Sequence, residues 1–240
     1  MSSAGICGVV ARRIDLPITA ETIAHLERRL GDIAQRDIKW QENVRPPSTS
    51  EDFALDVIFV VCNSGMTHTT ALIIFDRVKR ALLAGKRCRS AYRHPGKSKA
   101  IDKIWKDRSQ YFSRYLYLSE GTANEEELLE FFEELPFIGP ITRYHVAKNF
   151  GVDVAKPDVH LQRLSELDGR SVRELCRDLS FSTGYGQATI DIILWRACAC
   201  GLLDSRTGLL RDEHDESHDG GGMPLKRSGR QKTCRQQQPA

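Results

Sequence analysis

The stretch from Leu135 to Leu164 holds the residues whose types and spacing could do chemistry. An acidic amphipathic helix leads into a tight hairpin at residues 137–139, and a second helix starts at once with Pro140 in its first turn, where a missing N–H costs nothing. Such a turn presents several backbone N–H groups at a positively polarised helix N-terminus. The pattern therefore predicts an anion site that suits a phosphate and reads no base.

Asp158 lies seven residues beyond Gly151, which ends the second helix of this hairpin. It follows Lys156-Pro157 and precedes the apolar-periodic segment 159–167, so we expect it at a helix start. An aspartate in that position suits an N-cap. On the residues alone, capping is the simpler interpretation.

Charge is unevenly distributed along a chain whose net charge is only +3. Segment 86–115 holds ten Lys and Arg residues against two acids, whereas segment 120–134 holds seven Glu and no basic residue. A basic segment beside an acidic one suggests a local polyanion footprint. Two solvated helix faces would produce the same pattern.

The elements that must position these residues are predicted to be helices, about ten in one body over residues 13–210. Segment 53–62 is nearly all apolar and favours a buried helix, with a buried strand as the alternative, and segment 97–118 is one helix or two. No alternating strand pattern is present. The other predicted helices are 18–38, 67–84, 124–135, 140–150, 158–167, 171–179 and 187–202.

Composition bounds the rest of the chain. With 40% apolar and 28% charged residues, it is typical of a globular protein, and no apolar run is long enough for a signal peptide or a membrane anchor. Seven scattered cysteines favour a reducing compartment, either the cytoplasm or the nucleus. We expect residues 1–12 to be flexible and residues 211–240 to form a disordered tail.

The ordered motifs resemble the helix-hairpin-helix DNA glycosylase superfamily. Leu135, Pro136, Ile138, Gly139 and Thr142 match its L-P-G-h-G hairpin pattern, here spanning residues 125–150. The Asp of its catalytic segment falls on Asp158, within residues 156–164. Segment 96–104 is similar to its x-x-x-K-A-x-x-I helix, and segment 53–70 resembles the part that supplies a loop inserted into the base stack.

The resemblance implies two helical subdomains flanking a DNA cleft, and an enzyme that hydrolyses the N-glycosidic bond of a base flipped out of duplex DNA. Asp158 would be its catalytic carboxylate, stabilising an oxocarbenium-like sugar or orienting water. The expected partner is double-stranded DNA, bound by a monomer. A non-catalytic DNA-binding module and a fold relative acting on hypermodified bases are the alternatives.

Three departures from the family pattern refine this expectation. Phe137 replaces the hairpin's first glycine, so the turn must accommodate a side chain that packs or touches DNA. Ile141 occupies the position of the nucleophilic Lys of lyase-competent members, so no Schiff base can form there. The four cysteines of the iron–sulfur branch are not matched. The pattern is closest to the monofunctional alkylpurine branch, similar to 3-methyladenine glycosylase II.

Residues 63–66 are expected to be the wedge that fills the gap left by the flipped base, with an ordinary interhelical turn as the alternative. Asp56 is a carboxylate in an apolar helix and is expected to face the base pocket or to pair with an Arg. The expected wedge and base-pocket residues are Asn63, Ser64, Gly65, Met66 and Asp56. The predicted DNA contacts are Pro136, Phe137, Ile138, Gly139, Pro140, Ile141, Thr142, Arg143, Lys97, Lys99 and Lys148.

No metal site and no organic cofactor are expected. The family resemblance implies only a monovalent cation at the hairpin, held by the backbone carbonyls of Leu135 and Ile138.

Overall fold

The computed structural model describes residues 13–121 and 124–211 of the chain. Within these ranges it contains eleven α-helices, one short 3-10 turn and no β-strand, and isolated antiparallel bridges join Arg13 to Leu209 and Leu203 to Leu210. The all-α prediction is confirmed. None of these helices is long and apolar enough to cross a bilayer. The expectations for residues 1–12 and for the tail beyond Arg211 lie outside the described residues.

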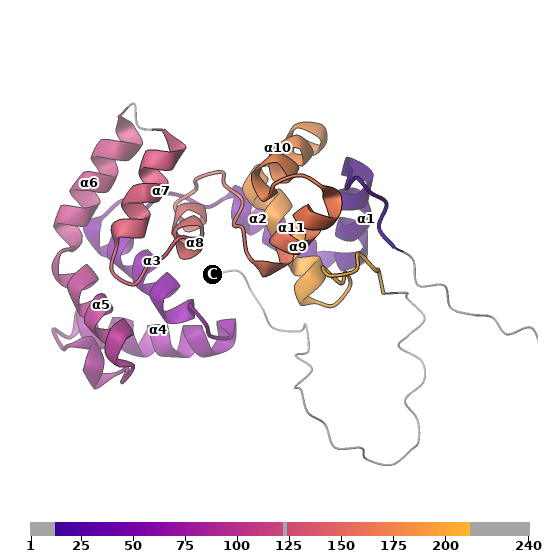
Figure 1. Ribbon diagram of the computed structural model, residues 1–240. Helices are drawn as coiled ribbons and strands as arrows, with labels where there is room; N and C mark the ends of the chain where they lie inside the picture. The colour runs from indigo at the N-terminus through magenta and orange to yellow at the C-terminus, as the bar shows by residue number, and fades with distance from the viewer. Residues whose placement is uncertain (1–12, 122–123, 212–240) are drawn as a thin grey trace, which may run out of the picture.

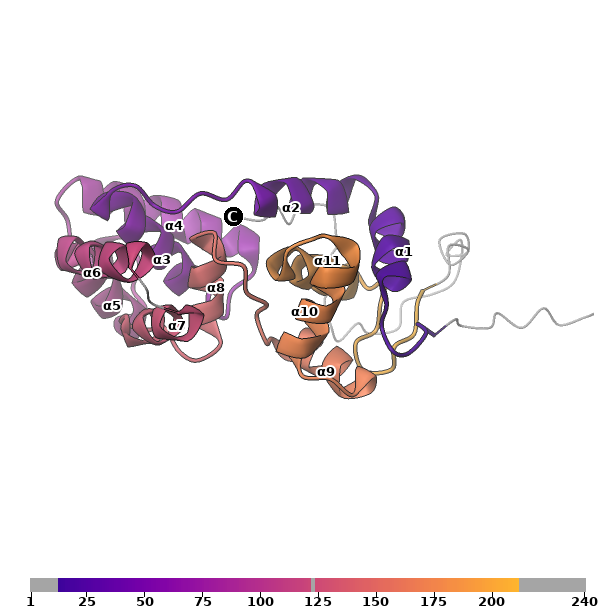
Figure 2. The same cartoon turned by 90° about the horizontal axis from the view of Figure 1, so that it is seen from above.

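The helices form two lobes, each with its own apolar core, as the family resemblance implied, whereas helical periodicity alone had indicated one body (Figure 1). The first lobe contains α3 (Ser50–Asn63), α4 (His68–Leu83), η1 (Cys88–Ser90), α5 (Pro95–Lys106), α6 (Arg108–Glu120), α7 (Glu125–Glu134) and α8 (Thr142–Asn149). The second contains α1 (Ala20–Leu30), α2 (Asp32–Glu42), α9 (Val159–Asp168), α10 (Val172–Thr183) and α11 (Gln187–Ala199). The chain crosses between them twice, through residues 43–49 and 150–158 (Figures 1 and 2).

Helix α3 is the centre of the first lobe. It packs against α4, α5, α6 and α8, and a helix covered on most sides can be apolar nearly all round. This is why its sequence also suited a buried strand, an alternative that is wrong. The ring of Phe53 is fully buried and lies 5.3 Å from the ring of Phe150 and 5.7 Å from that of Tyr115.

Helix α11 has the same central position in the second lobe, between α1, α2, α9 and α10. Its Arg196 is 1% exposed and donates from Nε to Asp37 Oδ2 of α2 at 2.5 Å. A buried guanidinium needs such a carboxylate, because an unpaired charge in the core would cost several kcal/mol. The pair therefore fixes how α2 and α11 meet.

One predicted helix is divided in the structure. The segment expected to form one helix over 18–38 is broken at Gly31, whose φ of +54° is unfavourable for other residues. The segment 97–118, expected to be one helix or two, forms two helices divided at Asp107. Helix α3 is capped by Thr49, whose side chain accepts from Asp52 N at 3.0 Å.

Candidate active site and DNA interface

The predicted hairpin joins α7 to α8. Ile138 N donates to Leu135 O at 3.0 Å, and Gly139 N donates to Thr142 Oγ1 at 2.7 Å. Helix α8 begins at Thr142, two residues later than predicted, with Ile141 as its N-cap residue. Phe137 has φ of +69°, so the chain keeps the left-handed geometry that glycine would adopt, at a cost of about 1–3 kcal/mol.

The ring of Phe137 is held against the start of α5. It meets the His94 ring edge-on at 6.1 Å, and Lys97 Nζ lies 5.8 Å from its centroid. A Cβ added to Gly96 would lie 3.3 Å from the ring, so glycine gives the ring its space. Phe137 nevertheless remains 44% exposed. The expected packing is present, and contact with DNA stays a prediction.

The end of α8 at the hairpin is open to an anion. Within the described residues, the backbone N–H groups of Ile141 and Thr142 donate to no protein acceptor. Ile141 is 37% exposed, and Pro140 beside it is also exposed. Free N–H groups at a helix N-terminus attract phosphate, so the local geometry suits the predicted contact.

The predicted wedge is a tight turn between α3 and α4. Met66 N donates to Asn63 O at 3.0 Å, Gly65 has φ of +68°, and the Met66 side chain is 39% exposed. Lys97 Nζ donates to Ser64 O at 2.5 Å and to Cys62 O at 3.4 Å. The ammonium group therefore holds the backbone of this turn from inside the protein, while the Met66 side chain is partly exposed to solvent.

Three cations that were predicted to touch phosphates have partners inside the protein instead. Lys97 is 3% exposed and Lys148 is 8% exposed. Arg143 pairs with Glu126 at 3.0 Å and with Glu133 at 3.2 Å, both on α7. Each cation lies on the face of its helix that meets a neighbour, which sequence spacing did not reveal. Lys99 is exposed on α5 and stays a predicted contact.

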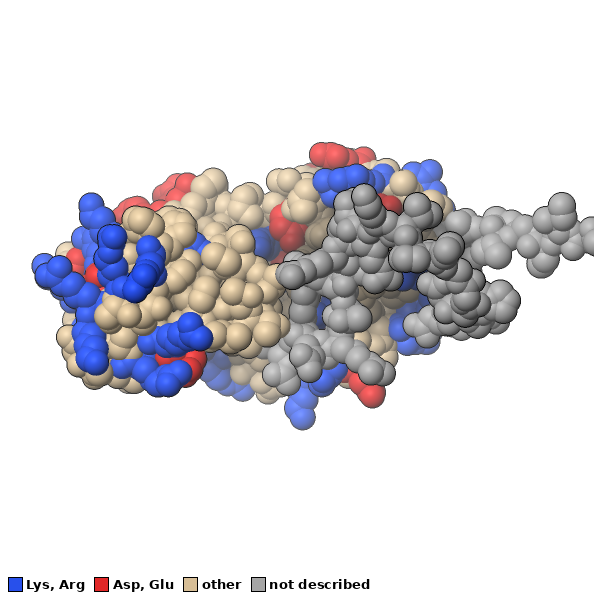
Figure 3. Space-filling view, turned by 90° about the horizontal axis from the view of Figure 1, so that it is seen from below, with Lys and Arg blue, Asp and Glu red and all other residues tan. Residues whose placement is uncertain are grey.

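The basic segment found in the sequence is a surface feature of the first lobe. Figure 3 shows Lys and Arg side chains gathered at the outer end of that lobe, with a mostly uncharged surface between them and the grey atoms. The exposed cations of this segment within the described residues include Lys86, Arg87, Arg89, Arg93, Lys99, Lys103 and Lys106.

Asp158 is the N-cap of α9. Its Oδ1 accepts from His160 N at 2.9 Å and from Leu161 N at 3.1 Å, which confirms the capping role. The residue is half-buried. Both hydrogen bonds fall on Oδ1, and Oδ2 accepts none from the described residues. One carboxylate oxygen therefore remains available for a ligand.

A second carboxylate, Asp191 of α11, holds the segment that carries Asp158. Asp191 Oδ2 lies 2.6 Å from Lys148 Nζ of α8 and accepts from Lys156 N at 2.8 Å. Asp191 is 3% exposed, so this is a buried, charge-assisted contact. It ties the second helix of the hairpin to the second lobe and sets the linker two residues before Asp158.

Asp153 makes a further tie between this linker and α11. Its Oδ1 accepts from Ala188 N at 2.9 Å, and a Cβ added to Gly186 would lie 2.6 Å from the same oxygen. Gly186 is therefore required for the carboxylate to approach the start of α11.

Two histidines lie where the lobes meet. Burial lowers the pKa of His145 on α8 to about 3, helped by the positive charges of Lys156 and Lys148. Burial also lowers the pKa of His68 at the start of α4, together with the charge of Arg196 in the other lobe. Neither ring hydrogen-bonds another described residue. Both are neutral at physiological pH, and a neutral imidazole can donate and accept one hydrogen bond each.

Asp56 has different surroundings from those expected. Burial, helped by the negative charge of Asp52 and opposed by the positive charge of Lys79, raises the pKa of its carboxyl to about 6. No Arg pairs with it among the described residues. Its charged neighbours lie at the start of α3 and in the second half of α4. The expected Arg pair is therefore not formed within the described residues, and the base-pocket position stays a prediction.

Backbone carbonyls are the donor type that a monovalent cation prefers, so the hairpin fits the expected ion in its chemistry. Leu135 O already accepts from Ile138 N at 3.0 Å, which leaves one lone pair, whereas Ile138 O accepts no hydrogen bond from the described residues. A cation held by Leu135 and Ile138 remains a prediction.

No protein-family model matches the sequence, and no curated protein matches it. The structure is similar to that of the 8-oxoguanine DNA glycosylase of Thermotoga maritima, with a TM-score of 0.55 and 17% sequence identity. The similarity covers 73% of this chain and 93% of that chain. The chain has the fold of a helical DNA glycosylase. At this identity the likeness shows the fold alone, and it confirms the fold that the hairpin motif implied.

Sequence reasoning missed the residues that join the lobes. Asp191 is a single acid within the apolar run Thr189 to Leu194. That pattern is the same one that drew attention to Asp56, and it could have marked Asp191 as a buried carboxylate with a partner. His145 and His68 carry no comparable signal in the sequence.

Replacing Asp191 with Asn should destabilise the protein by about 3–5 kcal/mol, because Lys148 would keep a buried charge without a counter-ion. Chemical denaturation measures this loss. Asp76→Asn is the matched control, since it removes an exposed partner of Arg80 and should cost at most about 1 kcal/mol. Equal effects of the two changes would contradict the central role of Asp191.

Replacing Asp56 with Asn should stabilise the protein at pH 7.5 by about 1–3 kcal/mol. The folded-state pKa of about 6 lies above the ordinary aspartate pKa of 3.8, so wild-type stability falls as the pH rises between these values. The gain should disappear below pH 4, where the carboxyl is protonated in both states. Denaturation curves from pH 3.5 to 7.5 test this, with exposed Glu51→Gln as the control, which should give no gain.

Proposed function

We propose that this chain is a DNA N-glycosylase that acts as a monomer on duplex DNA and excises a flipped base. The observation that carries the proposal is the state of Asp158. Its carboxylate is fixed at a helix start through Oδ1, and Oδ2 accepts no hydrogen bond from the described residues. The shared fold with a DNA glycosylase supports it.

Departure of a base leaves positive charge on the sugar. A carboxylate beside the anomeric carbon stabilises that oxocarbenium-like state or orients the water that attacks it. Asp158 is proposed for this role. The tie through Asp191 and Lys156 holds it in place before DNA binds, so little reorganisation is needed during reaction.

The target nucleotide must leave the duplex before its sugar can be reached. The open N–H groups of Ile141 and Thr142 are proposed to hold a phosphate of the backbone. Met66 on its anchored turn is proposed to fill the space left in the base stack. Phe137 supplies exposed apolar surface on the hairpin between α7 and α8.

We propose hydrolysis without strand cleavage. The position from which a lysine would attack the sugar holds Ile141, whose side chain has no amine. The product would be an intact strand with an abasic site.

For the base that is excised, the proposal includes more than one chemical class. The sequence resemblance points to alkylpurines, whereas the structurally similar protein is named for 8-oxoguanine. A substrate test must therefore include both classes, together with hypoxanthine, oxidised pyrimidines and hypermodified bases.

Asp158→Asn should reduce base release by about 10²-fold or more while DNA affinity is kept. Asn caps a helix as well as Asp does, so the change should leave the fold intact and remove only the charge. Mass spectrometry of free bases released from pooled lesion-bearing duplexes measures the effect. Glu166→Gln, an exposed change on the same helix, is the control and should leave release unchanged.

The outcomes separate the proposal from its alternative. Release that disappears in the Asn variant identifies both the substrate and the role of Asp158. Equal release from wild type and variant would limit Asp158 to capping α9. No release from any duplex, with salt-sensitive DNA binding retained, would indicate a non-catalytic binding module.

Borohydride should trap no covalent adduct between the wild-type protein and an abasic duplex. The Ile141→Lys variant is the positive control, because it restores an amine at the position where a Schiff base could form. Adducts are counted on denaturing gels. A wild-type adduct above the level of a protein without glycosylase fold would show that another amine reaches the sugar.

A further inference from the structure

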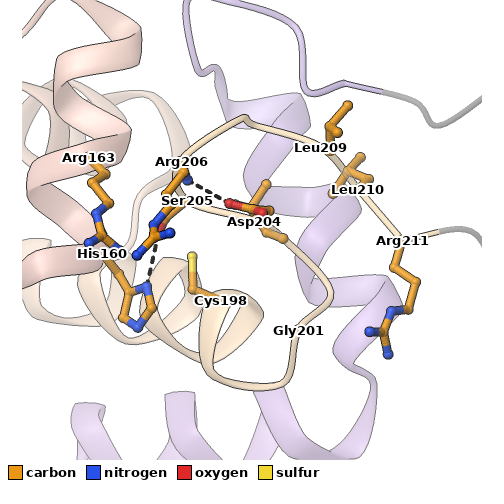
Figure 4. A pocket seen from close by; sticks show the side chains of 11 residues that line it. His160, Arg163, Cys198, Gly201, Asp204, Ser205, Arg206, Leu209, Leu210 and Arg211 are labelled. Atoms are coloured by element: carbon orange, nitrogen blue, oxygen red, sulfur yellow. Dashed lines mark hydrogen bonds between the residues drawn. The ribbon is translucent and has the colours of Figure 1, made fainter. Parts of the chain in front are cut away.

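The loop after α11 encloses a pocket of about 580 Å³ against α9, away from the hairpin (Figure 4). Three arginines from two segments line it: Arg163 from α9, and Arg206 and Arg211 from the loop. His160 adds an imidazole, and no Phe, Tyr or Trp lines the pocket. Its chemistry therefore differs from that of a site that stacks a base.

The loop that carries two of these arginines is held by its own backbone. Asp204 N donates to Leu209 O at 2.9 Å, Gly208 N donates to Asp204 O at 2.8 Å, and Arg211 N donates to Leu202 O at 2.9 Å. These bonds form a closed turn, so Arg206 and Arg211 start from fixed backbone positions. Because the backbone of these two arginines is already ordered, less conformational entropy is lost when their side chains bind a ligand.

The polar groups at one end of the pocket are also oriented. Ser205 Oγ lies 3.0 Å from His160 Nδ1, and Ser205 is 4% exposed. The hydrogen bond fixes the ring of His160 in the pocket, as Figure 4 shows. Figure 4 also shows the side chains of Arg163 and Arg206 lying close to this ring.

The lining of the pocket carries more positive than negative charge. Asp204 is the one carboxylate among the lining residues, and its Oδ1 accepts from Arg206 N at 2.7 Å. Its single negative charge stands against three arginines, and within the described residues no carboxylate forms an ion pair with the side chain of Arg163, Arg206 or Arg211. Burial raises the pKa of the Cys198 thiol to about 12, with Asp158 and Asp204 adding to the shift, so this lining residue stays neutral.

We propose that this pocket is a second anion site, which binds one phosphate group through Arg163, Arg206 and His160. Guanidinium groups match phosphate in shape and form paired hydrogen bonds with it. An anion would also relieve the repulsion among the gathered cations. The phosphate group belongs either to a DNA backbone or to a small free phosphate compound.

The pocket is physically joined to the candidate catalytic carboxylate. His160 N donates to Asp158 Oδ1 at 2.9 Å, while the His160 side chain lines the pocket. A phosphate bound here would therefore contact the first turn of α9, whose N-cap residue is Asp158. The DNA source rests on the proposed function, whereas the phosphate site itself does not.

Thermal unfolding of the full chain, titrated with potassium phosphate against potassium chloride at equal ionic strength, tests the site. Wild type should show a saturable rise in melting temperature. Arg163→Gln/Arg206→Gln should weaken phosphate binding about tenfold or more. Arg28→Gln, an exposed change on α1 with no ion pair among the described residues, should bind phosphate as wild type does. No saturable rise in wild type, or an unchanged double variant, would overturn the proposal.

A second variant guards against loss of the fold. Arg163→Lys/Arg206→Lys keeps both charges but removes the planar donor pair, so it should bind phosphate several-fold more weakly than wild type. Equal binding by this folded variant and wild type would exclude the paired guanidinium contact and overturn the proposed geometry.

A DNA-binding measurement distinguishes a backbone phosphate of DNA from a small free phosphate compound as the ligand of the pocket. The affinity for a duplex with an uncleavable abasic analogue is measured over a range of salt. If the site holds a backbone phosphate, the Gln double variant should reduce the slope of log K against log salt by about 1 to 2. An unchanged slope, with phosphate binding lost, assigns the pocket to a small free phosphate compound.

Failure of the inference can be told from failure of the proposed function. Base release that depends on Asp158, without phosphate binding at the pocket, would refute only the second site. Saturable phosphate binding that the double variant removes, without base release from any duplex, would refute only the glycosylase. The two measurements share no readout.

Discussion

The carboxylate of Asp191 is the contact on which the geometry of the candidate site depends. A single buried oxygen receives the ammonium group of Lys148 and the backbone N–H of Lys156. The first belongs to the second helix of the hairpin and the second to the linker before Asp158. Because both bonds are short and shielded from water, they resist screening by salt. One buried carboxylate of the second lobe thus positions both the hairpin proposed to hold a phosphate and the linker that leads to the candidate catalytic carboxylate.

Other cations near the hairpin also bind groups inside the protein. Lys97 supports the turn of Ser64, and Arg143 joins α8 to the acidic helix α7. These charged side chains hold neighbouring elements of the first lobe together and point toward them rather than toward solvent. What remains exposed is apolar or backbone: Met66, Phe137 and the N–H groups at the start of α8. For the proposed DNA partner, long-range attraction would come from the exposed cations at the outer end of the first lobe and from the arginines of the proposed second anion site.

The observed capping role of Asp158 and its proposed catalytic role are compatible because a carboxylate has two oxygens. Oδ1 satisfies the N–H groups at the start of α9, and this fixes the rotamer of the side chain. Oδ2 is then presented in one direction. Capping, which is the simpler interpretation of the residue, is therefore what makes the chemical role feasible. The neutral imidazoles of His68 and His145 add hydrogen-bonding groups at the meeting of the lobes without adding charge.

The sequence by itself determined the elements whose causes are local. Helical periodicity, the cap at Asp158 and the hairpin pattern at 135–142 all depend on neighbours a few residues apart, and the structure contains them. Only the tertiary structure decided which cations face inward, because Lys97, Arg143 and Lys148 find partners that lie 10 to 43 residues away along the chain. It also decided how the helices divide between the two cores, which the family resemblance implied and helical periodicity did not. Burial creates these pairings, and burial depends on how whole helices pack, which periodicity along one segment does not encode.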